Sequence, residues 1–232
     1  MTMYMQRIIK ELRTKNKLSQ EQVALAIGVS RPTYSAIEAG KQKLDTDEVK
    51  KLANLYTVSV DDLLSGHIPN IAKYKQMILS YLRMNLSKDG KIPKTKLAKL
   101  LYLADFAWFY DHTESMSGMQ YRKIEHGPVP DMFFRALEEL EEDGKIEVDR
   151  KTDDKDRAMF LISESESNHN EKITTLSPGE LNLMNQIGTK WKDKKTKEIV
   201  NFTHNQLPYF LCKMEEIIPY VLIVQEDPDK VF

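Results

Sequence analysis

Apolar residues recur every three or four positions along most of this 232-residue chain, a spacing typical of amphipathic helices. Up to residue 66 the spacing predicts five short helices. Beyond it, helices are predicted over 71–86, 95–110, 131–143, 177–191 and 196–204. Lys145 to Asp149 and Ala158 to Ile162 favour strands, and the charged turn between them predicts a β-hairpin. The fold class is therefore mainly α: a five-helix domain over residues 1–66, then a mostly helical domain over residues 67–232 with a small β-hairpin.

Short polar residues and glycines mark where the first helices begin and end. Ser19-Gln20-Glu21-Gln22 has the pattern of a capping box, in which the serine hydroxyl accepts from the third helical N–H and the last glutamine reaches back. Gly28 provides a sharp turn, and Ser30 caps a third helix. Ser59 is predicted to cap the fifth helix. Two helices joined by a tight glycine turn form the geometry that places a helix in the major groove of DNA.

The charge is distributed unevenly along the chain. The formal net charge is −1, yet residues 1–43 hold eight Lys or Arg residues against three Glu residues. A phosphate backbone binds to a local basic surface and does not require a basic protein as a whole. This segment is therefore where a DNA duplex is expected to dock.

Four motifs follow one another in the first domain: Leu18-Ser19-Gln20-Glu21-Gln22-Val23-Ala24, Gly28-Val29-Ser30, Ile37-Glu38-Ala39-Gly40-Lys41 and Val58-Ser59-Val60-Asp61-Asp62-Leu63-Leu64. In this order they resemble the Cro and phage-repressor (Xre-type) helix-turn-helix domain. The resemblance implies binding to a double-stranded DNA operator. It also implies a homodimer, which places two reading helices about 34 Å apart on one face of the duplex.

The resemblance assigns roles to individual residues. Gln20 matches a position that contacts phosphate, and Lys41 and Lys43 match positions that contact the DNA backbone. The start of the reading helix is formed by Ser30, Arg31, Thr33, Tyr34 and Ser35, of which Arg31 is the strongest candidate for a bidentate contact to guanine.

Pro32 departs from the family pattern, since relatives usually carry a polar reading side chain at this place. A proline in the first helical turn costs little, because the N–H that it lacks has no partner within the helix. It cannot donate a hydrogen bond to a base.

Alternatives stand beside these assignments. Lys10, Arg13 and Lys15 are either phosphate contacts or solvated surface charges. Tyr34 is either a reading residue or a core residue that braces the turn. The domain as a whole could also have lost DNA binding and serve only for dimerisation or protein contact.

The second domain has a different pattern. Its predicted helix over 95–110, with Thr95 as the cap, is apolar nearly all round, which indicates a central position or an interface. His126-Gly127-Pro128-Val129-Pro130 is interpreted as a rigid break before the next helix. The polar run over 163–171 holds too little apolar area to offset its ordering entropy, so a mobile loop is expected there.

Three motifs in this domain are Lys96-Leu97-Ala98-Lys99-Leu100-Leu101-Tyr102-Leu103-Ala104-Asp105, then Tyr121 with Gly127-Pro128-Val129-Pro130, and Ile218-Pro219-Tyr220. They resemble the Panacea domain of phage-linked and toxin–antitoxin proteins. The resemblance implies binding and neutralisation of a protein toxin encoded nearby, whose class the family does not fix.

The helix around Tyr102 is the candidate toxin-binding surface, because exposed aromatic side chains anchor protein interfaces. The candidate residues are Tyr102, Asp105, Trp108, Tyr121, Gly127 and Pro128. A core role for Tyr102 and Trp108 is the alternative. The acidic residues between Glu138 and Asp143 are interpreted as a solvated helix face, or else as a contact for a basic toxin groove or a mimic of nucleic acid.

Other classes of chemistry find no support in the sequence. Cys212 is the one cysteine, and the five histidines form no HxxxH or HExxH pair, so neither a disulfide nor a metal site is expected. Without a glycine-rich phosphate loop or an acid–base constellation, no cofactor and no catalytic residue are expected. The apolar stretches fall short of the roughly 18 to 20 residues of a membrane span, so no membrane partner and a cytoplasmic location are expected.

These features predict a DNA-binding antitoxin that represses its own operon and neutralises a toxin by direct binding. The alternative is a phage-type transcriptional regulator whose second domain senses a ligand or oligomerises without any toxin. A third class, an enzyme that acts on nucleic acid, requires an acid–base constellation that the sequence does not show.

Overall fold

The computed structural model describes residues 3–56, 58, 60–65, 68–87, 89–152 and 158–232. The chain divides into two compact units, Met1–Pro69 and Asn70–Phe232, each with a hydrophobic core of its own. We call them the first unit and the second unit. The domain boundary predicted between residues 66 and 67 falls on residues outside the described ones.

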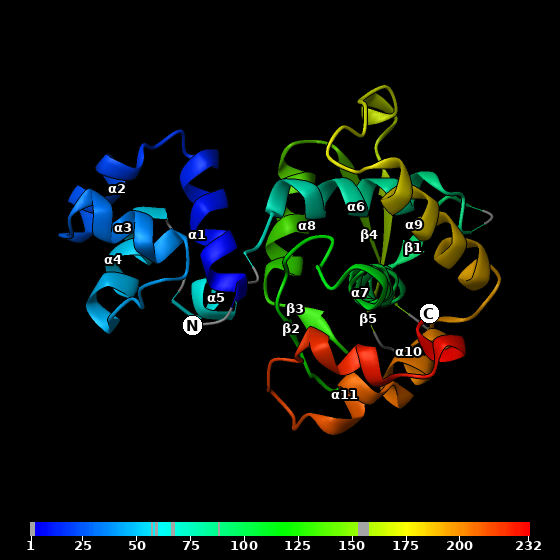
Figure 1. The fold of residues 1–232 in the computed structure, drawn as a ribbon. Helices are drawn as coiled ribbons and strands as arrows, with labels where there is room; N and C mark the ends of the chain where they lie inside the picture. The colour runs from blue at the N-terminus through cyan, green and yellow to red at the C-terminus, as the bar shows by residue number, and fades with distance from the viewer. Residues whose placement is uncertain (1–2, 57, 59, 66–67, 88, 153–157) are drawn as a thin grey trace. The chain divides into compact units, whose positions relative to one another are not determined.

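The five helices predicted from apolar spacing are present in the first unit (Figure 1). They are α1 (Met3–Lys15), α2 (Gln20–Ile27), α3 (Arg31–Glu38), α4 (Thr46–Tyr56) and α5 (Val60–Ser65). Their apolar faces meet in one core, where Ile9, Ile37 and Leu52 are fully buried. The predicted cap of the fifth helix, Ser59, lies outside the described residues.

Local capping explains where α2 begins and ends. Ser19 Oγ accepts from the N–H of Gln22 at 3.1 Å, and Gln22 Oε1 accepts from the N–H of Ser19 at 2.8 Å. These two bonds confirm the predicted capping box. Gly28 ends α2 with a φ of 84°, a left-handed conformation that disfavours residues with a Cβ by about 1 kcal/mol. The turn then leads directly into α3.

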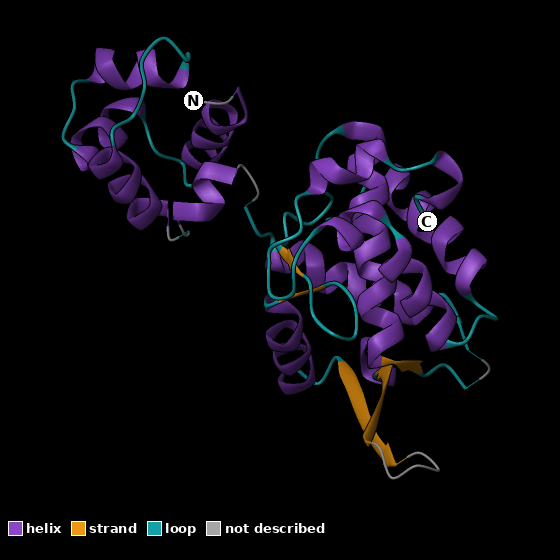
Figure 2. Ribbon diagram, turned by 90° about the horizontal axis from the view of Figure 1, so that it is seen from below, coloured by secondary structure: helices purple, strands orange, loops and turns teal. Residues whose placement is uncertain are grey.

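The second unit contains longer helices and all the strands that the structure describes (Figure 2). Its helices are α6 (Ile71–Arg83), α7 (Lys94–His112), α8 (Met132–Glu142), α9 (Pro178–Trp191), α10 (Thr196–Asn205), α11 (Leu207–Leu211) and the 3₁₀ helices η1 (Glu166–Asn168), η2 (Tyr220–Gln225) and η3 (Pro228–Lys230). The mainly α fold class is confirmed. The prediction that Thr95 caps the central helix is wrong, because α7 begins at Lys94 with Pro93 at the N-cap position.

The predicted hairpin belongs to a three-stranded sheet. β4 (Ile146–Thr152) and β5 (Ala158–Glu164) pair antiparallel with Val148 opposite Ile162, and the turn over 153–157 lies outside the described residues. β1 (Ile92–Pro93) pairs with the other edge of β5, so the strand order is β1-β5-β4. The sequence analysis missed β1, since a two-residue strand carries no periodic pattern.

A second, smaller sheet lies near the predicted rigid break. β2 (Tyr121–Arg122) pairs antiparallel with β3 (Val129–Pro130). Ile217 forms a bridge to Arg122 on the other side of β2. This arrangement brings the segment just before Pro219 to a sheet edge, the place that a nearby proline tolerates.

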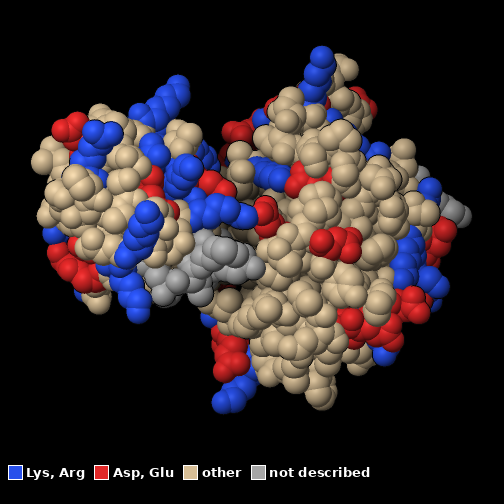
Figure 3. Space-filling view, viewed as in Figure 1, with Lys and Arg blue, Asp and Glu red and all other residues tan. Residues whose placement is uncertain are grey.

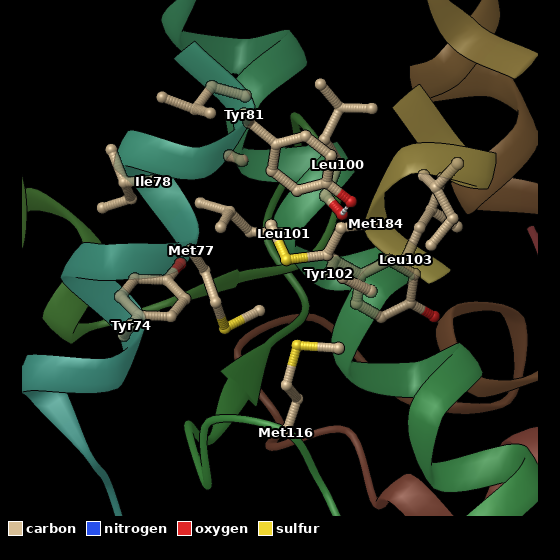
Figure 4. Packing of buried hydrophobic residues seen from close by; sticks show 14 of the residues in the cluster. Tyr74, Met77, Ile78, Tyr81, Leu100, Leu101, Tyr102, Leu103, Met116 and Met184 are labelled. Atoms are coloured by element: carbon tan, nitrogen blue, oxygen red, sulfur yellow. Dashed lines mark hydrogen bonds between the residues drawn. The ribbon is translucent and has the colours of Figure 1, made fainter. Parts of the chain in front are cut away.

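Helix α7 is the centre of the second unit, and Figure 1 shows it nearly end-on among its neighbours. It packs against α6, α9, α10 and η2. Every residue from Lys96 to Ala107 is buried, at 6% exposure or less. In Figure 4, Tyr74, Met77 and Tyr81 of α6 and Met184 of α9 surround the same core. The predicted burial of this helix on both sides is confirmed.

The polar run over 163–171 is not the mobile loop that its composition predicted. The Glu164 side chain is 2% exposed, and Arg83 of α6 holds it with bonds of 2.8 Å from Nε and 2.6 Å from Nη2. The same guanidinium donates to the backbone carbonyls of Asn168 at 3.1 Å and Glu171 at 2.7 Å. One arginine from a distant helix therefore orders a segment that has little apolar area of its own.

Candidate functional site

The residues predicted to read DNA bases lie at the start of α3. Ser30 is the N-cap, and its Oγ accepts from the N–H of Thr33 at 3.2 Å. Ser30, Arg31 and Pro32 are exposed, whereas Thr33 and Ser35 are half-buried. The helix start thus presents a short polar surface with one arginine, and a helix of this size enters a major groove.

Tyr34 faces the core and not the solvent. Its side chain is fully buried, and its hydroxyl lies 3.4 Å from the hydroxyl of Tyr56 on α4. Burial, together with the hydrogen bond to Tyr56, raises the pKa of Tyr34 far above its ordinary value. Of the two roles open to Tyr34, the structure supports the core residue that braces the turn, and a base contact by its side chain is ruled out by its burial.

Gln20 takes part in an ionic network at the start of α2. Glu38 Oε2 accepts from Gln20 Nε2 at 2.8 Å, and Glu38 Oε1 accepts from Arg13 Nε at 2.6 Å. Burial raises the pKa of Glu38, but the hydrogen bonds from Arg13 and Gln20 outweigh it, and the net shift is downward. The second amide hydrogen of Gln20 stays available to bind a phosphate. The backbone N–H groups at the start of α2 can bind the same phosphate.

Arg13 is not a solvated surface charge. Its side chain is 16% exposed and joins α1 to α3 through Glu38, which is 5% exposed. Arg13 Nη1 also donates to the backbone carbonyl of Leu18 at 3.1 Å. Lys10 and Lys15 on the same helix are exposed, so both of their predicted roles stay open.

Two exposed lysines follow the reading helix directly. Lys41 and Lys43 lie after Gly40, whose φ is 72°. A Cβ at Gly40 would lie 2.5 Å from Gln6 Nε2, the end of a flexible side chain that can move, so the positive φ is the main reason for glycine here. Figure 3 shows blue Lys and Arg side chains spread over the first unit. Contact of Lys41 and Lys43 with DNA stays a prediction.

In the second unit, the motif residues form a buried polar network. Asp105 of α7 is fully buried, and its carboxylate accepts from Ser117 N at 2.7 Å, Ser117 Oγ at 2.5 Å and Tyr121 Oη at 2.8 Å. Burial raises the pKa of Asp105 to about 6, although the bonds from Ser117 and Tyr121 favour the charged form. Asp105 therefore ties the central helix to β2 and the loop before it.

A second buried link joins α7 to the rigid break. Lys99 is fully buried, and its Nζ donates to the carbonyl of Pro128 at 2.8 Å. Burial lowers the pKa of Lys99 to about 7. Gly127 has a φ of 93°, and a Cβ there would lie 2.7 Å from Lys99 Cε and 3.0 Å from His204 Nε2. The Gly-Pro motif is thus explained by close packing against Lys99.

The predicted toxin-binding surface is not a surface. Tyr102, Asp105 and Tyr121 are fully buried, and Gly127 and Pro128 are buried as well. Trp108 is partly exposed and stacks on the His112 ring with a centroid distance of 3.7 Å. The alternative, a core role, holds for Tyr102. The premise of exposed aromatic side chains fails for Tyr102 and Tyr121, because other elements, among them α10 and η2, pack around α7.

A different region of the second unit exposes large apolar side chains. We call it the apolar surface: Phe210 (70% exposed), Leu211 (55%), Met214 (51%), Ile217 (43%), Val221 (60%) and Val224 (47%). These residues lie on α11, on η2 and on the segment between them, and α11 packs against η2. Figure 3 shows a tan area over this part of the second unit, and the exposed Lys213, Glu215 and Glu216 belong to the segment between the two helices. Monomeric proteins rarely expose such patches unless a partner binds there.

The sequence analysis missed the apolar surface. The only available signal was a run of apolar residues around Pro219 without helical periodicity, and such a run looks the same whether it is buried or exposed. Among the described residues, no group of three or more His, Cys, Asp or Glu side chains is arranged to hold a metal ion. No described helix combines the length and the apolar character needed to cross a membrane.

Comparisons with known proteins agree with this division of the chain. A helix-turn-helix family model matches residues 9–63, and the model described as antitoxin SocA-like, Panacea domain matches residues 97–208. No solved structure matches the chain.

Curated relatives are transcriptional regulators. The chain is 40% identical over 81 residues to the cryptic phage CTXphi transcriptional repressor RstR of Vibrio cholerae, a match that spans 35% of this chain and 70% of that protein. It is 44% identical over 62 residues to the uncharacterized HTH-type transcriptional regulator YobD of Bacillus subtilis (strain 168), a match that spans 27% of this chain and 54% of that protein. It is 38% identical over 58 residues to the HTH-type transcriptional activator BcrR of Enterococcus faecalis, a match that spans 25% of this chain and 28% of that protein.

Proposed function

We propose that this chain, which belongs to the helix-turn-helix transcriptional regulators and carries an antitoxin SocA-like Panacea domain, is the DNA-binding antitoxin of a type II toxin–antitoxin system. In this proposal it neutralises a toxin encoded nearby by direct binding. It also represses its own operon as a homodimer on a double-stranded operator.

The observation that carries the proposal is the presence of both families in one chain. A regulator needs only the first, and a toxin-binding protein needs only the second. In the first unit, sequence reading is supported by the exposed Arg31 at the start of α3, with Ser30 and Thr33 beside it. Lys41 and Lys43 supply charge for the phosphates that flank the groove.

The apolar surface supports a protein partner for the second unit. It combines an aromatic residue, a methionine and branched apolar residues, with Lys213, Glu215 and Glu216 beside them. Aromatic and methionine side chains are enriched in protein interfaces, and charged ones are depleted at interface centres. Because the family description of this unit names an antitoxin, we assign the surface to the toxin and not to a second copy of the chain.

Co-expression tests the proposal. The reading frame next to the gene is expressed alone, with the full chain, with Met214→Asp or with the matched control Met159→Asp, which alters a methionine that is 38% exposed on β5. The neighbouring product is expected to arrest growth, and the full chain and Met159→Asp are expected to restore it. Met214→Asp is expected to lose rescue while keeping operator binding.

A transcriptional regulator without a toxin partner would give a different result in this co-expression test. If the neighbouring product is harmless, or if it arrests growth and the chain neither restores growth nor co-purifies with it, the second unit has no toxin and the antitoxin assignment fails. If both methionine variants restore growth equally, the toxin binds elsewhere and the assignment of the apolar surface fails.

A further inference from the structure

Lysines are concentrated where α9 ends and α10 begins. Between residues 190 and 197 the chain carries five lysines and one acidic residue, Asp193, in a second unit that is otherwise slightly acidic. We use the name lysine surface for Lys192, Lys194, Lys195 and Lys197, all of which are exposed. Figure 3 shows blue side chains gathered at the right-hand edge of the molecule, where α9 leads into α10.

Lys96 holds this turn in place from within. Its side chain is buried, and its Nζ donates to the backbone carbonyls of Lys192 at 3.1 Å and Lys194 at 2.8 Å. The first of these bonds satisfies the carbonyl at the C-cap of α9, and the second satisfies a carbonyl of the turn before α10. The turn is thus fixed to α7, and the lysine side chains extend from a rigid support.

Lys192, Lys194 and Lys195 line a cleft of about 670 Å³ together with Ser87, Asp193 and Thr196. The exposed lysines of this turn outnumber its one carboxylate, Asp193, which lines the same cleft. Lys194 lies 4.0 Å from Glu198, with both side chains about half exposed, and such a pair contributes little. In the described part of the chain, neither Lys192 nor Lys197 has a carboxylate within ion-pair distance.

The composition of this surface distinguishes it from a protein interface. Lysine is depleted in protein–protein interfaces, and no large aromatic or aliphatic anchor lies among the exposed lysines. Ammonium groups on long flexible stems suit phosphates, which need charge and tolerate variable geometry. A protein that already carries a helix-turn-helix unit meets such phosphates in duplex DNA.

We propose that the lysine surface is a second contact for the phosphate backbone of duplex DNA, separate from the reading helix. It adds affinity without sequence preference. The second unit therefore contributes to operator binding, in addition to any protein that it holds on the apolar surface.

Salt dependence tests the proposal on the full chain. Affinity for a scrambled duplex is measured from 50 to about 200 mM salt for the native chain and for Lys192→Gln, Lys195→Gln and Lys197→Gln combined. Each lost phosphate contact lowers the slope of log affinity against log salt by about 0.9, so a decrease of about 2 to 3 is expected. At about 100 mM salt the affinity is expected to fall at least tenfold, while the ratio of operator to scrambled affinity stays unchanged.

Two matched variants separate the loss of phosphate contacts from a general loss of positive charge. Lys151→Gln, Lys172→Gln and Lys213→Gln combined remove the same charge from other exposed sites of the second unit and are expected to leave the slope unchanged. Arginine at positions 192, 195 and 197 is expected to keep the native slope.

An unchanged slope in the glutamine triple variant would overturn the proposal. Loss of toxin neutralisation with unchanged DNA binding would also overturn it, because the surface would then hold an acidic protein. A decrease in slope equal to that of the control triple variant would show an effect of total charge only and would equally contradict the proposed site.

Discussion

The two units place the polar residues of their motifs in opposite environments. In the first unit, Ser30 and Arg31 lie on the surface at the start of a short helix. In the second unit, Lys99 and Asp105 are fully buried and hold loops against the central helix. A motif can therefore mark a binding surface in one domain and an internal clamp in the next. Its residue types alone do not tell the two apart, because burial is decided by elements far away in the sequence.

The largest expected effect concerns the buried ion pair of the second unit. Arg83→Met leaves the Glu164 carboxylate, 2% exposed, without its guanidinium, and breaking a buried pair costs about 3 to 5 kcal/mol. Both tryptophans, Trp108 and Trp191, belong to the second unit, so urea unfolding followed by tryptophan fluorescence reports on that unit.

An exposed ion pair provides the control. Lys145→Met removes the partner of Glu171, whose side chain is 45% exposed, and is expected to cost at most about 1 kcal/mol. If Arg83→Met is no more harmful than Lys145→Met, Arg83 does not order the segment over 163–171.

Gly127 and Gly144 both have a positive φ, but only Gly127 is closely packed. Substituting each by alanine therefore distinguishes the cost of a packing clash from the cost of backbone strain. Gly127→Ala combines a positive φ with a clash against Lys99 and is expected to destabilise the second unit by about 3 kcal/mol. Gly144→Ala has a φ of 67° with no atom near its Cβ, so about 1 kcal/mol is expected. Equal losses, measured by the same unfolding assay, would contradict the close packing of Lys99 on Gly127.

Acid is expected to affect the two units in opposite directions. Asp105 has a pKa of about 6 in the folded state against 3.8 for its ordinary value, so the folded chain binds the proton more tightly than the unfolded chain. Its contribution to stability therefore rises as the pH falls from 7 towards 4.5, by about 2 kcal/mol. The stability of Asp105→Asn, measured alongside the native chain by fluorescence, is expected to lack this rise.

Glu38 in the first unit has a lowered pKa, so its contribution is present at neutral pH and is lost as the pH falls through the folded value. Helical circular dichroism of Glu38→Gln and the native chain, compared from pH 7 downwards, follows this loss. The same direction of change for both carboxyl groups would contradict the contrast between the two sites.

At the DNA surface the expected effects are on binding and not on folding stability. Arg31→Ala is expected to lower the discrimination between operator and scrambled duplex by about 1 to 3 kcal/mol. Lys43→Ala is expected to weaken binding to both duplexes equally and to reduce the salt slope by about 1. Gel-shift titrations at several salt concentrations measure both quantities. Unchanged operator discrimination in Arg31→Ala would remove Arg31 from base reading.

Local signals in the sequence were sufficient for the helices and their caps. Ser19 and Ser30 cap the helices that they were expected to cap, and Ser177 caps α9 in the same way, because each of these hydrogen bonds joins residues three positions apart. The hairpin formed by β4 and β5 was predictable for the same reason, since its strands alternate and adjoin one turn.

Contacts between distant residues were not predictable. The order of the segment over 163–171 depends on Arg83, and the burial of Tyr102 depends on elements near the end of the chain. The apolar surface and the lysine surface also escaped the sequence analysis, because exposure follows from the packing of α9, α10 and η2 and not from composition. The third helix was predicted from its cap and is present as α3, yet only the structure shows that Tyr34 faces the core.

The central claim is that duplex DNA and a protein partner bind to different units of one chain. Its most direct test measures operator affinity and toxin neutralisation for Arg31→Ala and Met214→Asp in the full chain. The account predicts a crossed result: Arg31→Ala loses operator discrimination and still restores growth, whereas Met214→Asp binds the operator normally and fails to restore growth. Loss of both activities in each variant, or loss of neutralisation in Arg31→Ala alone, would contradict it.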